Sequence, residues 1–208
     1  MSKNTFETMT LHAPRLVLAS TSPYRKMLLE RLGLPFDTLA PQVDESARAD
    51  EDPAALALRL AEAKARAGGE QRPDALVIGC DQVAEFEGQP VGKPLDHADA
   101  FRQIRAMSGR TVLFHTGLAL LNVRSGRCQR ALVEVESTLR VLSDAAIENY
   151  LERDQPYDCA ASVKAETLGI AIFDRIGSDD PTALIGLPLI RLTAMLLAEG
   201  IDPLLAGA

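Results

Sequence analysis

Apolar and polar positions alternate along this chain with two different periods. Residues 15–19 and 75–79 are continuous apolar runs with the length expected of buried strands. Between residues 53 and 67 the apolar positions recur at helical spacing, and Gly68 and Gly69 then predict the end of that helix. The pattern therefore indicates buried strands joined by amphipathic helices.

Local capping and turn signals predict the other elements. Helices that begin with a capping side chain or an early proline are expected at residues 22–32, 96–107, 143–152 and 188–199. Strands are expected at residues 36–40, 83–86, 111–122, 131–142 and 169–175. The third and fourth of these flank a turn, and the fourth alternates apolar with polar residues, which predicts a half-exposed antiparallel hairpin.

The order of these elements predicts the fold class. Strands alternate with helices at first and neighbouring strands follow, which is typical of an α/β domain with a mixed β-sheet and helices on both faces. No repeat, low-complexity tract or linker divides the chain, so residues 14–208 are expected to form a single domain. Residues 1–13 are expected to be a loosely ordered leader without an evident function.

Charge and cysteine content narrow the classes of partner. The 208 residues include 22 Lys and Arg against 29 Asp and Glu, for a net charge of −7. Such an acidic chain is not expected to bind nucleic acid or an anionic membrane, although a local basic cluster can still hold a small anion. Three cysteines without a CxxC pair, no signal peptide and no apolar run of bilayer length favour a cytoplasmic protein.

Several common catalytic motifs are missing from the sequence. It contains no GxxxxGK[ST] phosphate loop, no GxGxxG after the first strand and no GxSxG elbow. Its three histidines have no metal-ligand spacing, and His115 lies within a strand pattern, where a structural role is expected. Serine–histidine catalysis and a histidine zinc site are therefore not expected.

Polar residues at the first strand–helix junction are candidates for binding an anion. Ser20 and Ser22 lie where the strand at 15–19 meets a helix N-terminus, and Arg25 lies on the first helical turn. Helix N-termini present backbone N–H groups and a positive dipole end to anions such as phosphate. Ordinary helix capping with a surface arginine explains the same residues, so both interpretations stay open.

A carboxylate at a buried strand is a stronger signal. Asp81 follows the apolar run at 75–79, where open α/β sheets place ligand crevices, and its desolvation needs a cation or water. Lys93 follows in a glycine–proline turn that would hold it rigidly. By themselves, Glu45 in an acidic loop and Lys64 on the long helix are interpreted as solvated side chains.

Taken together, these segments resemble the Maf family of nucleotide pyrophosphatases. The matching stretches are LASTSPYR at 18–25, VDE at 43–45, AKA at 63–65, IGCDQV at 78–83, GKP at 92–94, MSG at 107–109, TG at 116–117 and IGLP at 185–188. They occur in the family's order and extend over nearly the whole chain. No single stretch is decisive, but the ordered set is specific.

The resemblance implies an enzyme that cleaves a nucleoside triphosphate between its α and β phosphates, giving a nucleoside monophosphate and pyrophosphate. It also implies an elongated, Maf/ITPase-like α/β fold with the nucleotide in a cleft across the sheet, a divalent cation such as Mg²⁺ or Mn²⁺, a cytosolic location and often a homodimer. In the family, the aspartate matching Asp81 is the base that activates the attacking water.

The chemistry of the matching residues agrees with this activity. An acidic protein can hold a triphosphate only by local compensation, and the phosphate-binding candidates are Ser20, Ser22, Arg25, Lys64 and Lys93. Glu45 and Asp81 offer the hard oxygen ligands that Mg²⁺ prefers. The roles of base and metal ligand can coexist at Asp81, because a metal-bound water is already acidified.

Three positions resemble the branch of the family that acts on 7-methyl-GTP. The dTTP/UTP branch typically has Arg, Thr and Gln where this chain has Tyr24, Gln82 and Glu166. A cationic methylated guanine would stack well on Tyr24, and Glu166 could accept hydrogen bonds from the guanine N–H groups. We therefore expect these three residues to set the substrate specificity.

The late motif, CAASVKAET at residues 159–167, departs from the family pattern. Ala161 and Thr167 stand where relatives commonly have glycine, and Val163 where an aromatic residue is usual, which affects the expected shape of the base pocket. Two alternatives remain: a pyrophosphatase for dTTP, UTP or another modified nucleotide, and a nucleotide-binding regulator of cell division. A pure binding protein would not need Asp81.

Overall fold

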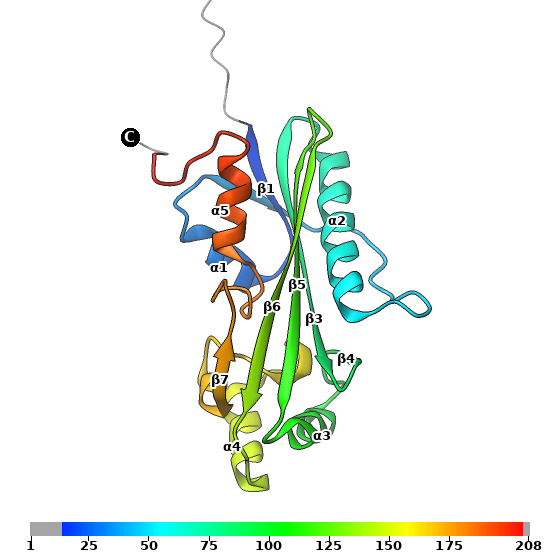
Figure 1. The fold of residues 1–208 in the computed structure, drawn as a ribbon, viewed down its shortest axis with the longest axis vertical. Coiled ribbons are helices and arrows are strands. Elements are labelled where there is room, and N and C mark those ends of the chain that lie inside the picture. Colours follow the sequence, from blue (N-terminus) through cyan, green and yellow to red (C-terminus); the bar gives the residue numbers. More distant parts are fainter. Residues whose placement is uncertain (1–13, 206–208) are drawn as a thin grey trace, which may run out of the picture.

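The structure, a computed structural model, describes residues 14–205 (Figure 1). Its strands are β1 (Arg15–Ala19), β2 (Phe36–Leu39), β3 (Ala75–Phe86), β4 (Gln89–Val91), β5 (Thr111–Asn122), β6 (Cys128–Leu139) and β7 (Phe173–Gly177). Its helices are α1 (Pro23–Glu30), α2 (Pro53–Gln71), α3 (His97–Met107), α4 (Asp144–Asp154) and α5 (Leu189–Leu197), with short 3₁₀ helices η1 (Ala160–Ser162) and η2 (Leu168–Ile172). The leader expected at residues 1–13 lies outside the described residues.

The seven strands form one mixed sheet in the order β2-β1-β3-β5-β6-β7, with β4 paired to β3. Strand β1 is parallel to β2 and β3, whereas β3, β5, β6 and β7 pair in an antiparallel manner. The α/β class, the mixed sheet and the hairpin of β5 with β6 are confirmed. None of the described helices is both long enough and apolar enough to cross a membrane.

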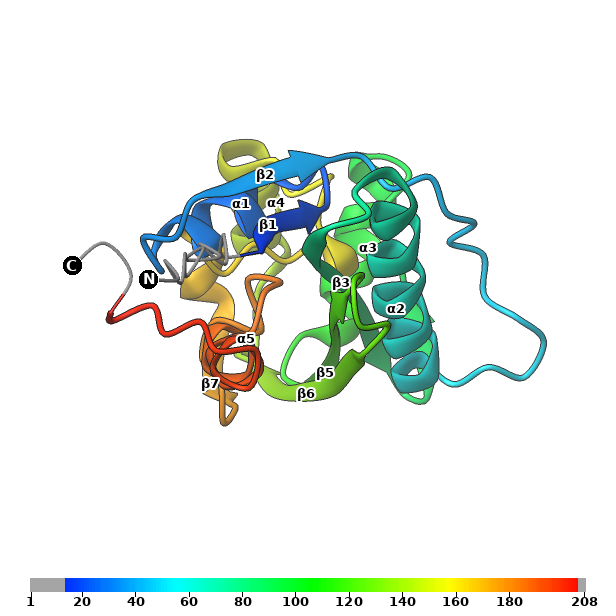
Figure 2. The same cartoon turned by 90° about the horizontal axis from the view of Figure 1, so that it is seen from above.

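Helices cover both faces of an elongated sheet (Figures 1 and 2). Helix α2 packs on one face over an alanine-rich cluster, and α1 and α5 pack on the other over a leucine-rich cluster. Helices α3 and α4 lie at the far end of the molecule and share a third apolar cluster with the ends of β5 and β6. The apolar core is therefore distributed along the sheet.

Helix α2 lies unusually close to the sheet because two glycines face it. A Cβ on Gly79 of β3 would lie 2.1 Å from the carbonyl oxygen of Ala61, and one on Gly117 of β5 would lie 2.3 Å from that of Ala57. Backbone therefore packs directly on backbone. This close approach fixes the height of α2 above β3.

The expected end of α2 at Gly68 was wrong, because the helix continues through both glycines to Gln71. A Cβ on Gly68 would lie 2.8 Å from Cγ1 of Val77. The glycine permits close packing on the sheet, and a sequence cannot distinguish that use from helix termination.

Strand β3 also differs from its expected form, because it runs without a break from Ala75 to Phe86. Asp81 therefore lies within a strand and not at its end. Its parallel neighbour β1 pairs with β3 only as far as Ile78, so the β1 edge of β3 is released just before Asp81. The end of β1 therefore leaves this edge of β3 open, and a crevice forms beside Asp81.

Later boundaries also differ from those expected. Strand β6 spans Cys128–Leu139 and not 131–142. Residues 168–172 form η2, so the strand expected at 169–175 exists only from Phe173. The last helix begins at Leu189, with Pro188 at the N-cap and not at the first helical position.

Candidate active site

A cleft of about 670 Å³ opens where β1 ends, between the loop before α2, strands β3 and β4, and the segment after α4. This volume lies in the range of small-molecule sites. The cleft gathers nine of the residues proposed from the sequence: Ser20, Ser22, Tyr24, Arg25, Glu45, Lys64, Asp81, Gln82 and Lys93. Glu166 is not among its lining residues.

A buried lysine joins two carboxylates at the centre of this cleft. The Lys64 ammonium donates to Oδ1 of Asp81 at 2.5 Å and lies 2.7 Å from Oε1 of Glu45. Lys64 and Asp81 are buried, whereas the Glu45 side chain is 62% exposed. The hydrogen bond from Lys64 lowers the pKa of Glu45, with help from Lys93 and Arg25. The Glu45 carboxylate is thus available as an anion at neutral pH.

This donor set suits a hard divalent cation. Two carboxylates converge on one point of positive charge, and Mg²⁺ typically binds to one or two carboxylates together with substrate phosphates. Within residues 14–205, no cluster of three or more His, Cys, Asp or Glu side chains suited to a metal is present. A cation at Glu45 and Asp81 would therefore need oxygen atoms from a substrate or water.

The first turn of α1 combines capping with a positive charge. Ser22 is the N-cap and its Oγ accepts from the backbone N–H of Arg25, while Ser20 Oγ accepts from the backbone N–H of Ser22 at 3.1 Å. The Arg25 guanidinium donates to Ser20 Oγ at 3.4 Å and to the carbonyl oxygen of Gly186 at 3.0 Å. Capping and a cleft-facing arginine therefore occur together at this junction.

The turn that carries Lys93 is held by the late motif. The backbone N–H of Ala161 donates to the carbonyl oxygen of Gly92 at 3.1 Å. Ala161 and Ser162 both have left-handed backbone conformations, with φ of 57° and 56°. Glycine adopts this conformation without strain, which gives a physical reason for the glycine that the resemblance leads us to expect at the position of Ala161.

Gln82 contacts a structural loop next to the cleft. Its Nε2 lies within 3.1 Å of three acceptors: Thr116 Oγ1 and the carbonyl oxygens of Ala183 and Leu184. Gln82 also lines the cleft beside Asp81. Its amide nitrogen thus hydrogen-bonds the loop at 183–186 to strand β3.

Tyr24 is bracketed by two charged residues that the sequence did not single out. Its hydroxyl donates to Oδ2 of Asp158 at 2.9 Å, and the Lys164 ammonium lies 5.3 Å from the centre of its ring. Burial raises the pKa of Tyr24, so the hydroxyl keeps the proton that it donates. Asp158 lines the cleft beside Tyr24. The only sequence signal for Asp158 was its place directly before the late motif.

Glu166 lies near this group but outside the cleft lining. Burial raises its pKa, Lys164 lowers it, and Asp158 and Asp154 raise it further. Its electrostatic neighbours therefore include the two charged residues that bracket Tyr24.

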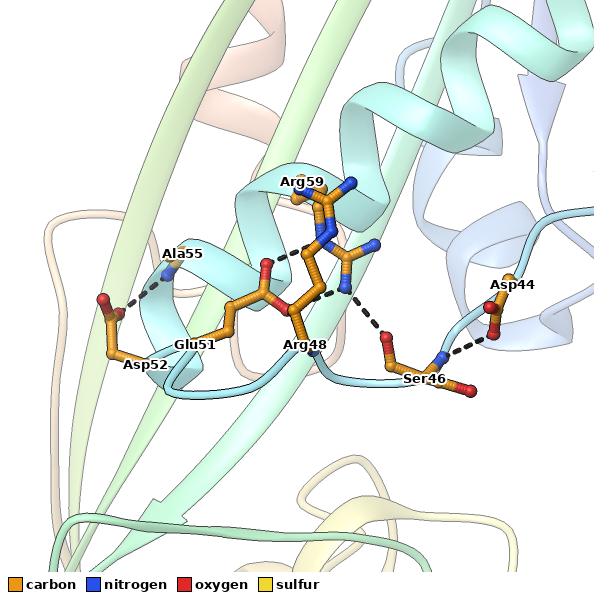
Figure 3. A network of polar contacts seen from close by, with 7 residues as sticks. All are labelled: Asp44, Ser46, Arg48, Glu51, Asp52, Ala55 and Arg59. Carbon is orange, nitrogen blue, oxygen red and sulfur yellow. Dashed lines mark hydrogen bonds and ion pairs between the residues drawn. The ribbon is translucent and has the colours of Figure 1, made fainter.

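The loop that carries Glu45 is held to α2 by an arginine that the sequence analysis missed (Figure 3). Arg59 donates to both carboxylate oxygens of Glu51, at 2.6 and 2.8 Å, and to the carbonyl oxygen of Ser46 at 3.0 Å. The Arg59 and Glu51 side chains are only 22% and 9% exposed, so solvent screens this pair weakly. Arg59 thus links the Glu45 loop to the helix that carries Lys64.

Other features of the fold are separate from this chemistry. A surface depression of about 750 Å³ beside β2 is lined by charges that pair with one another, including Arg15 with Asp37 and Lys26 with Glu30. His115 is buried between Glu85 and Glu134, 2.8 and 3.1 Å away, in keeping with the expected structural role. Neither feature contributes a residue to the cleft lining.

Comparison with known proteins identifies the family. A model described as "Maf-like protein" matches residues 15–199. The chain belongs to the Maf family. A protein from Albidiferax ferrireducens named 7-methyl-GTP pyrophosphatase is 54% identical over 190 residues, which cover 91% of this chain and 96% of the relative. Proteins of the same name from Thiobacillus denitrificans (54% identical, covering 94% and 98%) and Methylobacillus flagellatus (52% identical, covering 91% and 98%) are also similar.

Proposed function

We propose that this Maf family protein hydrolyses 7-methyl-GTP to 7-methyl-GMP and pyrophosphate. The observation that carries the hydrolytic activity is the Lys64 ammonium between the carboxylates of Glu45 and Asp81 in a cleft of nucleotide size. The substrate follows from relatives that are 52–54% identical over most of the chain and are named 7-methyl-GTP pyrophosphatase.

Positive charges from three elements hold the triphosphate. Arg25 on α1, Lys64 on α2 and Lys93 after β4 all line the cleft, and Ser20 and Ser22 add hydroxyl groups at the helix N-terminus. A triphosphate has about four negative charges, which this set compensates in part, and a divalent cation would supply the remaining positive charge. When the phosphates enter, they compete with Asp81 and Glu45 for the Lys64 ammonium.

Glu45 and Asp81 would hold the divalent cation. Bound there, Mg²⁺ or Mn²⁺ would neutralise phosphate charge and acidify water. Asp81, released from Lys64, accepts the proton of the attacking water as the new oxygen–phosphorus bond forms. The bond between the α and β phosphates breaks, and pyrophosphate leaves with its charge balanced by the basic side chains.

Tyr24 supports the preference for a methylated base. Methylation at N7 makes guanine cationic, and a cation stacks more favourably on an electron-rich ring than a neutral pyrimidine does. Gln82 shapes the cleft beside Asp81, and Glu166, which interacts electrostatically with Lys164, contributes negative potential. These are the specificity roles that we assign to the three residues.

A screen of pyrophosphate release tests the proposal. The purified protein is assayed with 7-methyl-GTP, GTP, UTP and dTTP, each with Mg²⁺ or Mn²⁺ and with chelator. We expect kcat/KM for 7-methyl-GTP to exceed the others by about ten- to a hundredfold, and activity to be lost with chelator. A preference for UTP or dTTP would place this chain in the pyrimidine branch, and binding without turnover would favour a regulatory protein.

A further inference from the structure

The cleft contains a negative charge next to an aromatic ring. Asp158 and Tyr24 are far apart in the sequence, yet the Tyr24 hydroxyl donates to Oδ2 of Asp158 at 2.9 Å and both residues line the cleft. A π face beside a carboxylate is the chemistry that attracts an organic cation.

A cation from the protein already lies near the Tyr24 ring, on a residue that is not itself among those lining the cleft. The Lys164 ammonium is 5.3 Å from the centre of the Tyr24 ring, within the distance at which cations are attracted to aromatic faces. Contact with Tyr24 raises the pKa of Lys164, and the Asp158 charge acts in the same direction. The ring and the carboxylate thus stabilise positive charge in the protein itself.

We propose that Tyr24 and Asp158 form a cation subsite that Lys164 occupies in the free protein and that the cationic 7-methylguanine ring takes over when the nucleotide binds. Exchange of one cation for another leaves Asp158 compensated. A neutral base that displaces Lys164 leaves Asp158 with less positive charge nearby, which disfavours GTP, UTP and dTTP. The inference deepens the proposed function and rests on it for the identity of the substrate.

The subsite makes opposite predictions for its two charged members. Asp158→Asn keeps an acceptor for the Tyr24 hydroxyl but removes the charge, so KM for 7-methyl-GTP should rise about three- to tenfold with little change in kcat. KM for GTP should fall, because a neutral base no longer leaves a carboxylate without its cation. Lys164→Met keeps the length of the side chain but removes the competing cation, so KM for 7-methyl-GTP should fall. Glu152→Gln, which changes an exposed carboxylate on α4, is the matched control and should leave both values unchanged.

A binding assay separates the subsite from the substrate assignment. Inhibition by 7-methylguanosine and by guanosine is measured against whichever triphosphate the protein hydrolyses best. We expect 7-methylguanosine to inhibit more strongly in the wild type and to lose this advantage in Asp158→Asn. The protein could instead prefer UTP as substrate and still be inhibited more strongly by 7-methylguanosine than by guanosine, in a way that depends on Asp158. In that case the proposed function fails and the subsite stands. Equal inhibition by the two nucleosides, or an advantage unchanged in Asp158→Asn, overturns the subsite.

Discussion

The ammonium of Lys64 and the carboxylate of Asp81 meet at 2.5 Å in the interior of the cleft, one carried by α2 and the other by β3. The close packing of α2 on Gly79 and Gly117 brings them together. A buried carboxylate needs such a partner, because desolvation of an unpaired charge is costly. The pair also bears on catalysis, since the Lys64 ammonium at Oδ1 competes with a proton from water for the charge of the Asp81 carboxylate.

Replacement of this carboxylate should stop hydrolysis without unfolding the protein. In Asp81→Asn, Lys64 keeps Glu45 as an anionic partner, so the fold should persist. Loss of the base and of one cation ligand should lower kcat at least ~10²-fold. Circular dichroism checks the fold and pyrophosphate release checks the rate. Asp174→Asn, at an exposed position of β7, is the control, and near-normal turnover by folded Asp81→Asn would refute the assignment.

Close packing under α2 gives a prediction about stability. In Gly79→Ala the new Cβ would lie 2.1 Å from the carbonyl oxygen of Ala61, so the helix must shift. We expect a loss of about 3 kcal/mol in the free energy of unfolding. Activity should fall as well, because the shift moves Lys64 relative to Asp81. Gly92→Ala, where the structure places no atom beyond the adjoining residues within 4 Å of the new Cβ, should cost little in urea unfolding. Equal stability of the two variants would contradict the packing argument.

Elements and site residues could be predicted from the sequence where a local motif or pattern marked them. The order of strands and helices followed from capping residues and periodicity, and Ser20, Lys64 and Asp81 carried recognisable motifs. Asp158 and Arg59 have no such motif. Their roles arise from contacts across the fold, with Tyr24 and with the Glu45 loop, which a single sequence does not encode locally.

The pair of Arg59 with Glu51 should give stability a defined dependence on pH. Hydrogen bonds from Arg59 lower the pKa of Glu51 from 4.5 to about 2. A lowered pKa contributes stability above the unfolded value, and this contribution is lost as pH falls towards the folded value. The difference in unfolding free energy between wild type and Glu51→Gln should therefore be constant from pH 7 to about pH 5 and shrink below that. Glu70→Gln, an exposed change on α2, is the control, and a difference that persists undiminished at pH 3 would exclude a charge-based effect.

Two carboxylates near Tyr24 can be ranked by their place relative to the cleft. Asp158 lines it and accepts from Tyr24 directly, whereas Glu166 is absent from the lining. The influence of Glu166 on the base is therefore that of a more distant charge, which falls off with distance and solvent screening. We expect Glu166→Gln to reduce the preference for 7-methyl-GTP over GTP by about twofold at most, and Asp158→Asn to reduce it about three- to tenfold. Both kcat/KM ratios are measured in the same assay, and because neither change touches Asp81, kcat for 7-methyl-GTP should stay near the wild-type value. A larger loss of preference in Glu166→Gln would mean that the segment after α4 moves on binding to bring Glu166 against the base.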